Sequence, residues 1–269
     1  SKPAAPPAVT KALGSIAEPR GGRYIRVWIG NARGEEGKTR VTFVWEPLPP
    51  IPGGERTPLG GVTLLATGPG NRSYFQGAVE PAPPAAGTPP PDGAAAGGTP
   101  GLSRREPAGV SFDVVPGSLN LRITVKGTGT ETLDTDVREY RIPDLTLPQV
   151  ALSTPAVFRT ANAREFRALN EHPNPVPTAS REFRRTERLL IRFEAYAPGT
   201  SAPEVTARVL NRGGTGMVDL QVRPPASGGG PHQIDLPLAG FASGEYLVEI
   251  KAKGAEGEAT ELVAMKITA

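Results

Sequence analysis

Short runs of alternating apolar and polar residues recur from Tyr24 to the end of the chain. In RYIRVWIG, the side chains of Ile25, Val27 and Ile29 fall on one face of an extended chain, because successive side chains of a strand point to opposite faces. A turn rich in glycine and charge follows, and TRVTFVWEP then resumes the alternation. The two runs predict a β-hairpin.

Runs of the same kind fill most of the remaining sequence. They include GVTLLATG, SYFQGAVE, AGVSFDVV, SLNLRITVKG, LDTDVREYRI, ERLLIRFEAYAP, EVTARVLNRGG, GMVDLQVRP, HQIDLPLAG, EYLVEIKAKG and TELVAMKIT. Glycine and proline separate the runs, and the helical periods that accompany parallel strands are missing between them. The pattern predicts an all-β protein made of two tandem immunoglobulin-like antiparallel β-sandwiches with an extended N-terminal arm.

Shifts in composition divide the chain into an arm and two domains. Residues 1–22 are rich in proline and alanine and predict an extended arm or linker. The proline-spaced segment Pro143–Pro148 predicts the joint between a first sandwich at 23–146 and a second at 147–269. Residues 81–101 are almost wholly proline, alanine, glycine and threonine, and we expect a mobile loop there because few apolar side chains offset its ordering entropy.

Composition also narrows the classes of function. The 269 residues include 31 prolines and 33 glycines, which disfavours long helices, and the net charge of +3 with mixed signs does not indicate nucleic acid as a partner. The absence of cysteine excludes disulfides and thiolate sites. The sequence contains no run of about 20 apolar residues and no signal-peptide core. It begins at Ser1 without methionine, and we expect a processed or excised piece of a longer protein.

The stretch GFASGEYLVEI places a tyrosine between two glutamates. In immunoglobulin-like sandwiches, a tyrosine near the start of a late strand often donates its hydroxyl to upstream backbone and fixes the corner between the sheets. Gly244 permits the turn and Tyr246 begins the strand, whereas Glu249 falls on the opposite face from Tyr246. We interpret Gly244 and Tyr246 as a structural tyrosine corner and not as part of an active site.

The sequence lacks the motifs of catalysis and metal binding. Its histidines, His172 and His232, lie in loops beside proline, without the spacing of a zinc site, and no serine-hydrolase elbow or phosphate-binding glycine loop occurs. Asp134 and Asp136 could meet a calcium ion, but alternating acids near Arg138 are more typical of a solvated strand face. We predict no catalytic residue, no cofactor and no metal ion.

Arginine and phenylalanine are interleaved between residues 158 and 192. This pattern occurs in proteins that bind single-stranded nucleic acid by stacking its bases on aromatic side chains. Here, however, glutamates at positions 165, 171, 182 and 187 would repel phosphates. Cross-strand ion pairs or an acidic protein partner explain the stretch better.

Aromatic residues provide the candidates for a binding surface. Trp28 and Trp45 are the first of them, and Trp28 lies with Tyr24 on the face opposite the apolar side of its strand, where it could stack on a sugar or a partner side chain. Tyr74 is a further candidate. The alternative is that both faces of the strand are covered, by the second sheet and by the proline loop.

Four stretches have the character of a known family: RYIRVWIGNARGEEGKTRVTFVWEP, REFRRTERLLIRFEAYAPG, VTARVLNRGG and IDLPLAGFASGEYLVEIKA. Together they resemble the carboxyl-terminal β-sandwich region of secreted bacterial proteins related to von Willebrand factor A, common in Acidobacteria. The resemblance covers most of residues 22–269 and implies an extracytoplasmic, non-enzymatic adhesion or assembly protein. The A domain, with its metal-binding D-x-S-x-S motif, is absent from this sequence, so no metal site is implied.

The sequence therefore predicts a structural or protein-binding module of an exported bacterial surface protein, with self-assembly as one option. We expect a protein partner or a second copy of the chain, no nucleic acid, no membrane span, and a location that is secreted, at the cell surface or periplasmic. The alternative is a carbohydrate-binding module that uses the aromatic residues of the first domain. A hydrolase built on loops is a third and weaker hypothesis, because the motifs it needs are missing.

Overall fold

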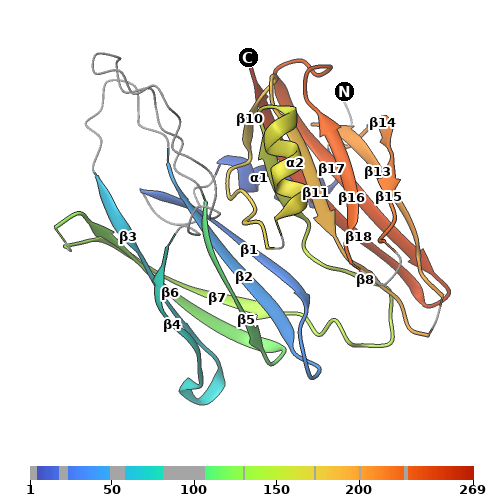
Figure 1. Cartoon of the computed structure of the whole chain (residues 1–269). Helices are drawn as coiled ribbons and strands as arrows, with labels where there is room; N and C mark the ends of the chain where they lie inside the picture. Colours follow the sequence, from blue (N-terminus) through green and yellow to red (C-terminus); the bar gives the residue numbers. More distant parts are fainter. Residues whose placement is uncertain are drawn as a thin grey trace, which may run out of the picture.

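The chain folds mainly into strands, which form two β-sandwiches (Figure 1). The computed structural model describes residues 5–17, 24–48, 58–80, 107–129, 131–172, 174–199, 201–226 and 230–269. The loop predicted at residues 81–101 lies outside these ranges. The predicted all-β fold of packed antiparallel sheets is confirmed.

The first sandwich packs a three-stranded sheet against a four-stranded sheet. Its strands follow the predicted runs and are β1 (Ile25–Arg33), β2 (Thr39–Pro47), β3 (Leu59–Thr67), β4 (Ser73–Val79), β5 (Ala108–Val114), β6 (Gly117–Gly127) and β7 (Thr132–Ile142), with the 3₁₀ turn η1 (Pro69–Asn71) before β4. The strand orders are β1-β2-β5 and β4-β3-β6-β7. Alternate residues such as Ile25, Phe43 and Leu121 are fully buried between the sheets and form the core.

The second sandwich is larger. Its elements are β8 (Ala151–Leu152), β9 (Ala156–Thr160), α2 (Ala163–Glu171), β10 (Glu182–Arg184), β11 (Arg188–Phe193), β12 (Ala195–Tyr196), β13 (Glu204–Asn211), β14 (Gly216–Leu220), β15 (Val222–Arg223), β16 (His232–Pro237), β17 (Gly244–Gly254) and β18 (Gly257–Thr268). The sheets have the orders β10-β18-β17-β13-β14 and β15-β16-β11-β9, and β12 pairs with β8. Only β10 among these described strands pairs in parallel, with the last residues of β18. Ile191, Val248 and Met265 lie in the core.

The N-terminal segment corrects one prediction. Residues Pro7–Ala17 form the helix α1 instead of an extended arm. The helix packs on the outer face of β17 and β18, where Val9 and Ile16 are buried against three residues of the second sandwich, namely Leu210, Leu247 and Ala264. The expectation of an extended conformation was therefore wrong for this part of the arm.

The sequence of α1 explains the error. Proline at the first helical position loses no hydrogen bond, because the first amides of a helix have no intrahelical acceptor. Val9 and Ile16 are spaced to share one face of a helix, although proline and alanine dominate the composition of the segment. A helix of 11 residues has little stability alone, and burial of this face on the second sandwich stabilises it.

Helix α2 is a second element that strand alternation does not predict. The side chain of Asn162 accepts a hydrogen bond from the backbone N–H of Glu165 at 2.9 Å, and the carboxylate of Glu165 accepts one from the N–H of Ala161 at 2.7 Å. This is a variant of the capping box, because the carboxylate reaches the residue before the N-cap, and the asparagine and glutamate three residues apart are its sequence signature. Within the described residues, neither helix has the length and apolar character needed to cross a membrane.

Candidate functional site between the two sandwiches

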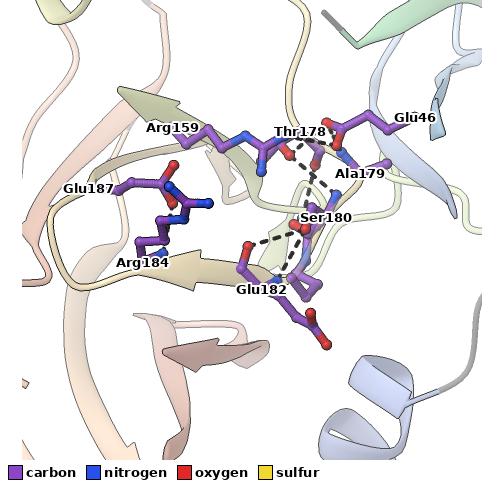
Figure 2. A network of polar contacts seen from close by, with 9 residues as sticks. Glu46, Arg159, Thr178, Ala179, Ser180, Glu182, Arg184 and Glu187 are labelled. Atoms are coloured by element: carbon purple, nitrogen blue, oxygen red, sulfur yellow. Dashed lines mark hydrogen bonds and ion pairs between the residues drawn. The ribbon is translucent and has the colours of Figure 1, made fainter. Parts of the chain in front are cut away.

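A buried carboxylate fastens the first sandwich to the second. Glu46, near the end of β2, is 5% exposed. Its Oε1 accepts hydrogen bonds from the hydroxyl of Thr178 at 2.6 Å and the backbone N–H of Ala179 at 3.0 Å. Its Oε2 accepts from the guanidinium of Arg159 at 3.0 Å (Figure 2). We call Glu46, Arg159, Thr178 and Ala179 the interdomain network.

The position of Glu46 follows from the alternation of β2. Phe43 and Trp45 point into the first core, so Val44 and Glu46 point to the outer face of the sheet. Val44 is nevertheless fully buried, because the segment around Val176 covers that face. Gly109 on the neighbouring β5 permits this approach, since a side chain there would come within about 3 Å of both Val176 and Val44.

Further hydrogen bonds tie β1 to the second sandwich. Two hydrogen bonds join Asn31 and Thr154. The N–H of Asn31 donates to the hydroxyl of Thr154 at 3.0 Å, and the N–H of Thr154 donates to the carbonyl of Asn31 at 2.8 Å. The hydroxyl of Tyr196 accepts from the N–H of Arg33 at 3.0 Å and donates to Glu194 at 2.8 Å. Burial raises the pKa of Tyr196 above its usual value, so the hydroxyl stays a donor.

A groove of about 520 Å³ opens between the sandwiches, next to this interface. It is lined by β1, β18, α1, the end of β7 and residues of the 154–181 segment. This volume lies in the range of ligand-binding clefts, which is roughly 300–1,000 Å³. We call it the interdomain groove and treat it as the candidate functional site.

One wall of the interdomain groove is the free edge of β1. β1 is the last strand of its sheet, and only β2 pairs with it along its length. Asn31 directs its backbone N–H and carbonyl away from β2, toward Thr154. Because these groups alternate in direction along an antiparallel strand, those of Ile29 and Val27 point to the same side. Both residues line the groove, and no backbone hydrogen bond reaches their outward groups from the described part of the chain.

The opposite wall is the free edge of β18. The N–H of Lys266 donates to the carbonyl of Arg181, away from β17. The register of β18 with β17 is regular, so the backbone groups of Ala264, Leu262 and Thr260 also point away from β17. All three residues line the groove, and β10 pairs only with residues 266–268. Two unpaired strand edges therefore border one groove.

In the described part of the chain, buried polar atoms without hydrogen-bond partners lie close to these edges. Within the described residues, Nη1 of Arg26 and Oδ1 of Asn31 are buried and have no hydrogen-bond partner. Glu261 is also among the residues that line the groove, and burial of its carboxyl raises its pKa to about 7. The other charged residues of the lining are cations: Lys11, Arg141 and Arg181.

Sequence reasoning missed Glu261, although one signal for it exists. Residues 259, 263, 265 and 267 of β18 form the apolar face that packs in the second core, and residue 261 belongs to the same face. A glutamate on an otherwise apolar strand face is a candidate for an unusual carboxyl, because burial disfavours its charged form. Arg26 gave no such signal, since polar residues are ordinary on the outer face of a sheet. Asn31 shares a face with Val27 and Ile29, so it is, like Glu261, a polar residue on an otherwise apolar strand face.

The aromatic residues predicted to form a binding surface, Tyr24, Trp28 and Tyr74, do not lie on one surface. Trp28 lies on β1 and Tyr24 directly precedes it, whereas Tyr74 lies on β4, at the edge of the other sheet of the first sandwich. The indole of Trp28 covers Gly30 and lines both the interdomain groove and a second groove of about 720 Å³ over β2 and β5. Trp45 is buried in the core, where its Nε1 donates to the carbonyl of Val79 at 2.8 Å. Carbohydrate binding through Trp28 stays a prediction.

Tyr246 has the contacts that a tyrosine corner requires. Its hydroxyl donates to the carbonyl of Ala242, four residues upstream, at 3.1 Å. Its ring meets Phe241 edge to face with a centroid distance of 5.4 Å, and Gly244, the first residue of β17, lies two positions before it. Glu249 points away from this contact and pairs with Arg208 at 2.6 Å. These interactions hold the turn onto the strand.

The two histidines make separate local contacts. Nδ1 of His172 accepts a hydrogen bond from the N–H of Asn174 at 3.2 Å, after the end of α2. His232 stacks on Phe193 with a centroid distance of 5.3 Å, and burial lowers its pKa. Within the described ranges, no group of three histidine or acidic side chains is placed to hold a metal ion, and Asp136 pairs with Arg138 at 2.6 Å.

The arginines between residues 159 and 192 are used largely within the second sandwich. Arg188 of β11 pairs with Asp235 of β16 at 2.5 Å, a cross-strand ion pair of the predicted kind. Its guanidinium also lies over the ring of Phe166, and that of Arg192 lies over Phe158. The interleaving of arginine and phenylalanine therefore builds contacts between neighbouring elements.

No protein-family model matches the sequence, and no curated protein matches it. Among solved structures, the fibronectin(III)-like modules of Clostridium thermocellum CbhA are similar over 90% of this chain and 94% of theirs, with 12% identity and a TM-score of 0.25. A tandem pair of titin immunoglobulin domains matches over 91% and 97%, with 10% identity and a TM-score of 0.23. The titin domains z1z2, solved in complex with telethonin, match over the same shares with 12% identity and a TM-score of 0.19. Values this low carry no inference about function.

Proposed function

We propose that the chain is a non-enzymatic structural and protein-binding module of an exported bacterial surface protein. The interdomain network supports the structural part, because it holds two sandwiches together through a buried carboxylate. The family resemblance of the sequence supports the exported, extracytoplasmic setting. Binding takes place at exposed strand edges, where a partner strand extends a sheet.

The observation that carries this proposal is the exposed apolar edge of the second sandwich. β14 is the last strand of the five-stranded sheet and lies at the outer side of the molecule (Figure 1). Its residues Met217 and Val218 are 53% and 46% exposed, and Asp219 is its single charged residue. An edge strand with this composition can pair with another strand.

The edge strand β7 of the first sandwich is protected by charge against pairing with another sheet. Charged side chains are frequent along it, namely Asp134, Asp136, Arg138, Glu139 and Arg141. Charge on an edge strand opposes pairing with another sheet. The contrast between these two edges favours β14 over β7 as the surface for association, and a second copy of the chain can pair with β14 antiparallel about a two-fold axis.

Sedimentation velocity tests this proposal directly. We expect the wild-type chain to form dimers as its concentration rises, because pairing of two β14 strands satisfies their outward backbone groups. The double variant Met217→Lys/Val218→Lys is expected to stay monomeric, since it places two like charges on each edge. Val137→Lys changes a valine on β7 that is 59% exposed and serves as the matched control. A wild-type chain that stays monomeric at all concentrations, or dimers that persist in the double variant, would contradict the proposal.

A further inference from the structure

We propose that the interdomain groove binds an extended acidic peptide, which adds as a strand to the free edge of β18 and places a carboxylate on Arg26. This inference rests on the proposed function of protein binding and names the site and the chemistry of the partner. It concerns a different edge from β14, so the two proposals can fail separately.

The backbone geometry of β18 supports strand addition. Thr260, Leu262 and Ala264 direct their N–H and carbonyl groups into the groove, on the same side of β18 as the N–H of Lys266 that donates to Arg181. β10 occupies the same edge further along, where it pairs with residues 266–268. A peptide beside residues 260–264 would therefore lie in line with β10 and complete the edge. Main-chain hydrogen bonds of this kind give affinity for extended peptides of varied sequence.

The charges of the groove favour an acidic peptide. Four cations line it, namely Lys11, Arg26, Arg141 and Arg181, against the single carboxyl of Glu261 among the described lining residues. Nη1 of Arg26 is buried without a partner, and a carboxylate is the acceptor that a guanidinium binds most strongly. A side-chain carboxylate of the peptide would satisfy this donor.

A second buried atom favours a peptide over a small carboxylic acid. Oδ1 of Asn31 is a buried acceptor without a partner in the described part of the chain. It needs an N–H donor, which a peptide backbone supplies and a simple carboxylate does not. The outward carbonyls of Val27 and Ile29 on the same strand also need donors, and their outward N–H groups need acceptors. An extended peptide provides donors, acceptors and a carboxylate together along the length of the groove.

The experiment uses the whole chain and a fluorescent peptide of alternating glutamate and valine, with blocked ends. Fluorescence anisotropy measures its affinity, and the amide chemical shifts of Leu262 and Ala264 locate the site. We expect binding that weakens about tenfold or more in Arg26→Gln, because a charge-assisted hydrogen bond is lost. Arg212→Gln removes an arginine that is 80% exposed outside the groove and is expected to leave the affinity unchanged.

Two further peptides separate strand addition from simple charge attraction. A lysine–valine peptide is expected not to bind, since the groove is positive. A glutamate–valine peptide with alternate N-methyl groups keeps its charge but cannot donate hydrogen bonds along one edge, and we expect its affinity to fall about tenfold. This peptide tests the inference without any change to the protein.

The outcomes distinguish this inference from the proposed function. Absence of binding, or equal affinity for the N-methylated peptide, would overturn strand addition at β18. If β14-dependent dimers form at the same time, the proposed function still stands. If the acidic peptide binds while the chain stays monomeric, the groove is a binding site and β14 is not.

Discussion

Replacing Glu46 with alanine is expected to lower the free energy of unfolding by about 3 kcal/mol, because truncating one partner of a buried ion pair is strongly destabilising. The Arg159 side chain is 17% exposed and loses the carboxylate beside it. The hydroxyl of Thr178 and the N–H of Ala179 lose their acceptor as well. Urea unfolding followed by far-ultraviolet circular dichroism measures the change.

Two further variants locate the origin of this loss. Glu46→Gln keeps an acceptor oxygen for Thr178 but removes the charge that faces Arg159, so we expect an intermediate loss. Glu36→Gln is the control, because Glu36 is 81% exposed and pairs with Lys38 at the surface. Its effect is expected to stay below about 0.5 kcal/mol. Equal stability of the Glu46→Ala and Glu36→Gln variants would contradict the role of the interdomain network.

The second large effect is a loss of stability between pH 4.5 and pH 7 that depends on Glu261. Burial raises the pKa of this carboxyl from 4.5 to about 7 in the folded protein. Between these values the unfolded chain has released the proton while the folded chain retains it, so stability falls as the pH rises. A difference of this size corresponds to about 3 kcal/mol. Above pH 7 both states are ionised and the contribution stays constant.

Cations line the same groove as Glu261, but burial sets the direction of its pKa. Lys11 of α1, Arg26 of β1, Arg141 of β7 and Arg181 line the same groove, and positive charge favours the carboxylate. Desolvation is the dominant cause, so the pKa remains raised.

Glu261→Gln tests this dependence on pH. The variant and the wild type are expected to be equally stable at pH 4, whereas the variant is expected to be more stable at pH 8 by about 3 kcal/mol. Glu258→Gln changes an exposed position of the same strand and is expected to keep the wild-type profile. Urea titrations at each pH give the free energies. Parallel profiles of wild type and Glu261→Gln would show that this carboxyl is not the cause.

Strand alternation predicted the sandwiches because each strand buries one face. Ile25, Val27 and Phe43 occupy the core positions that the pattern of β1 and β2 indicated. The outer face of β2 could not be predicted in the same way. Val44 and Glu46 are buried there by a segment more than 130 residues further along the chain. Local periodicity carries no information about such a contact, so the segment that covers this face of β2 was not predicted.

The interdomain groove was outside the reach of sequence analysis for the same reason. Its walls are β1, β18 and α1, which lie at opposite ends of the chain. Which strand edges remain unpaired depends on the order of strands in each sheet, and alternation gives strands without their order. The helix α1 was hidden by its composition, because proline and alanine outnumber the apolar residues Val9 and Ile16 that fix it to the second sandwich.

The distance between the two sandwiches tests most directly whether Glu46 holds them in one orientation. The chain lacks cysteine, so Arg122→Cys on β6 and Lys253→Cys on β17 place one spin label on each sandwich at exposed positions. Double electron–electron resonance is expected to give one narrow distance distribution in the otherwise wild-type chain and a broad one after Glu46→Ala. A broad distribution with Glu46 present, or an unchanged narrow one without it, would contradict this account.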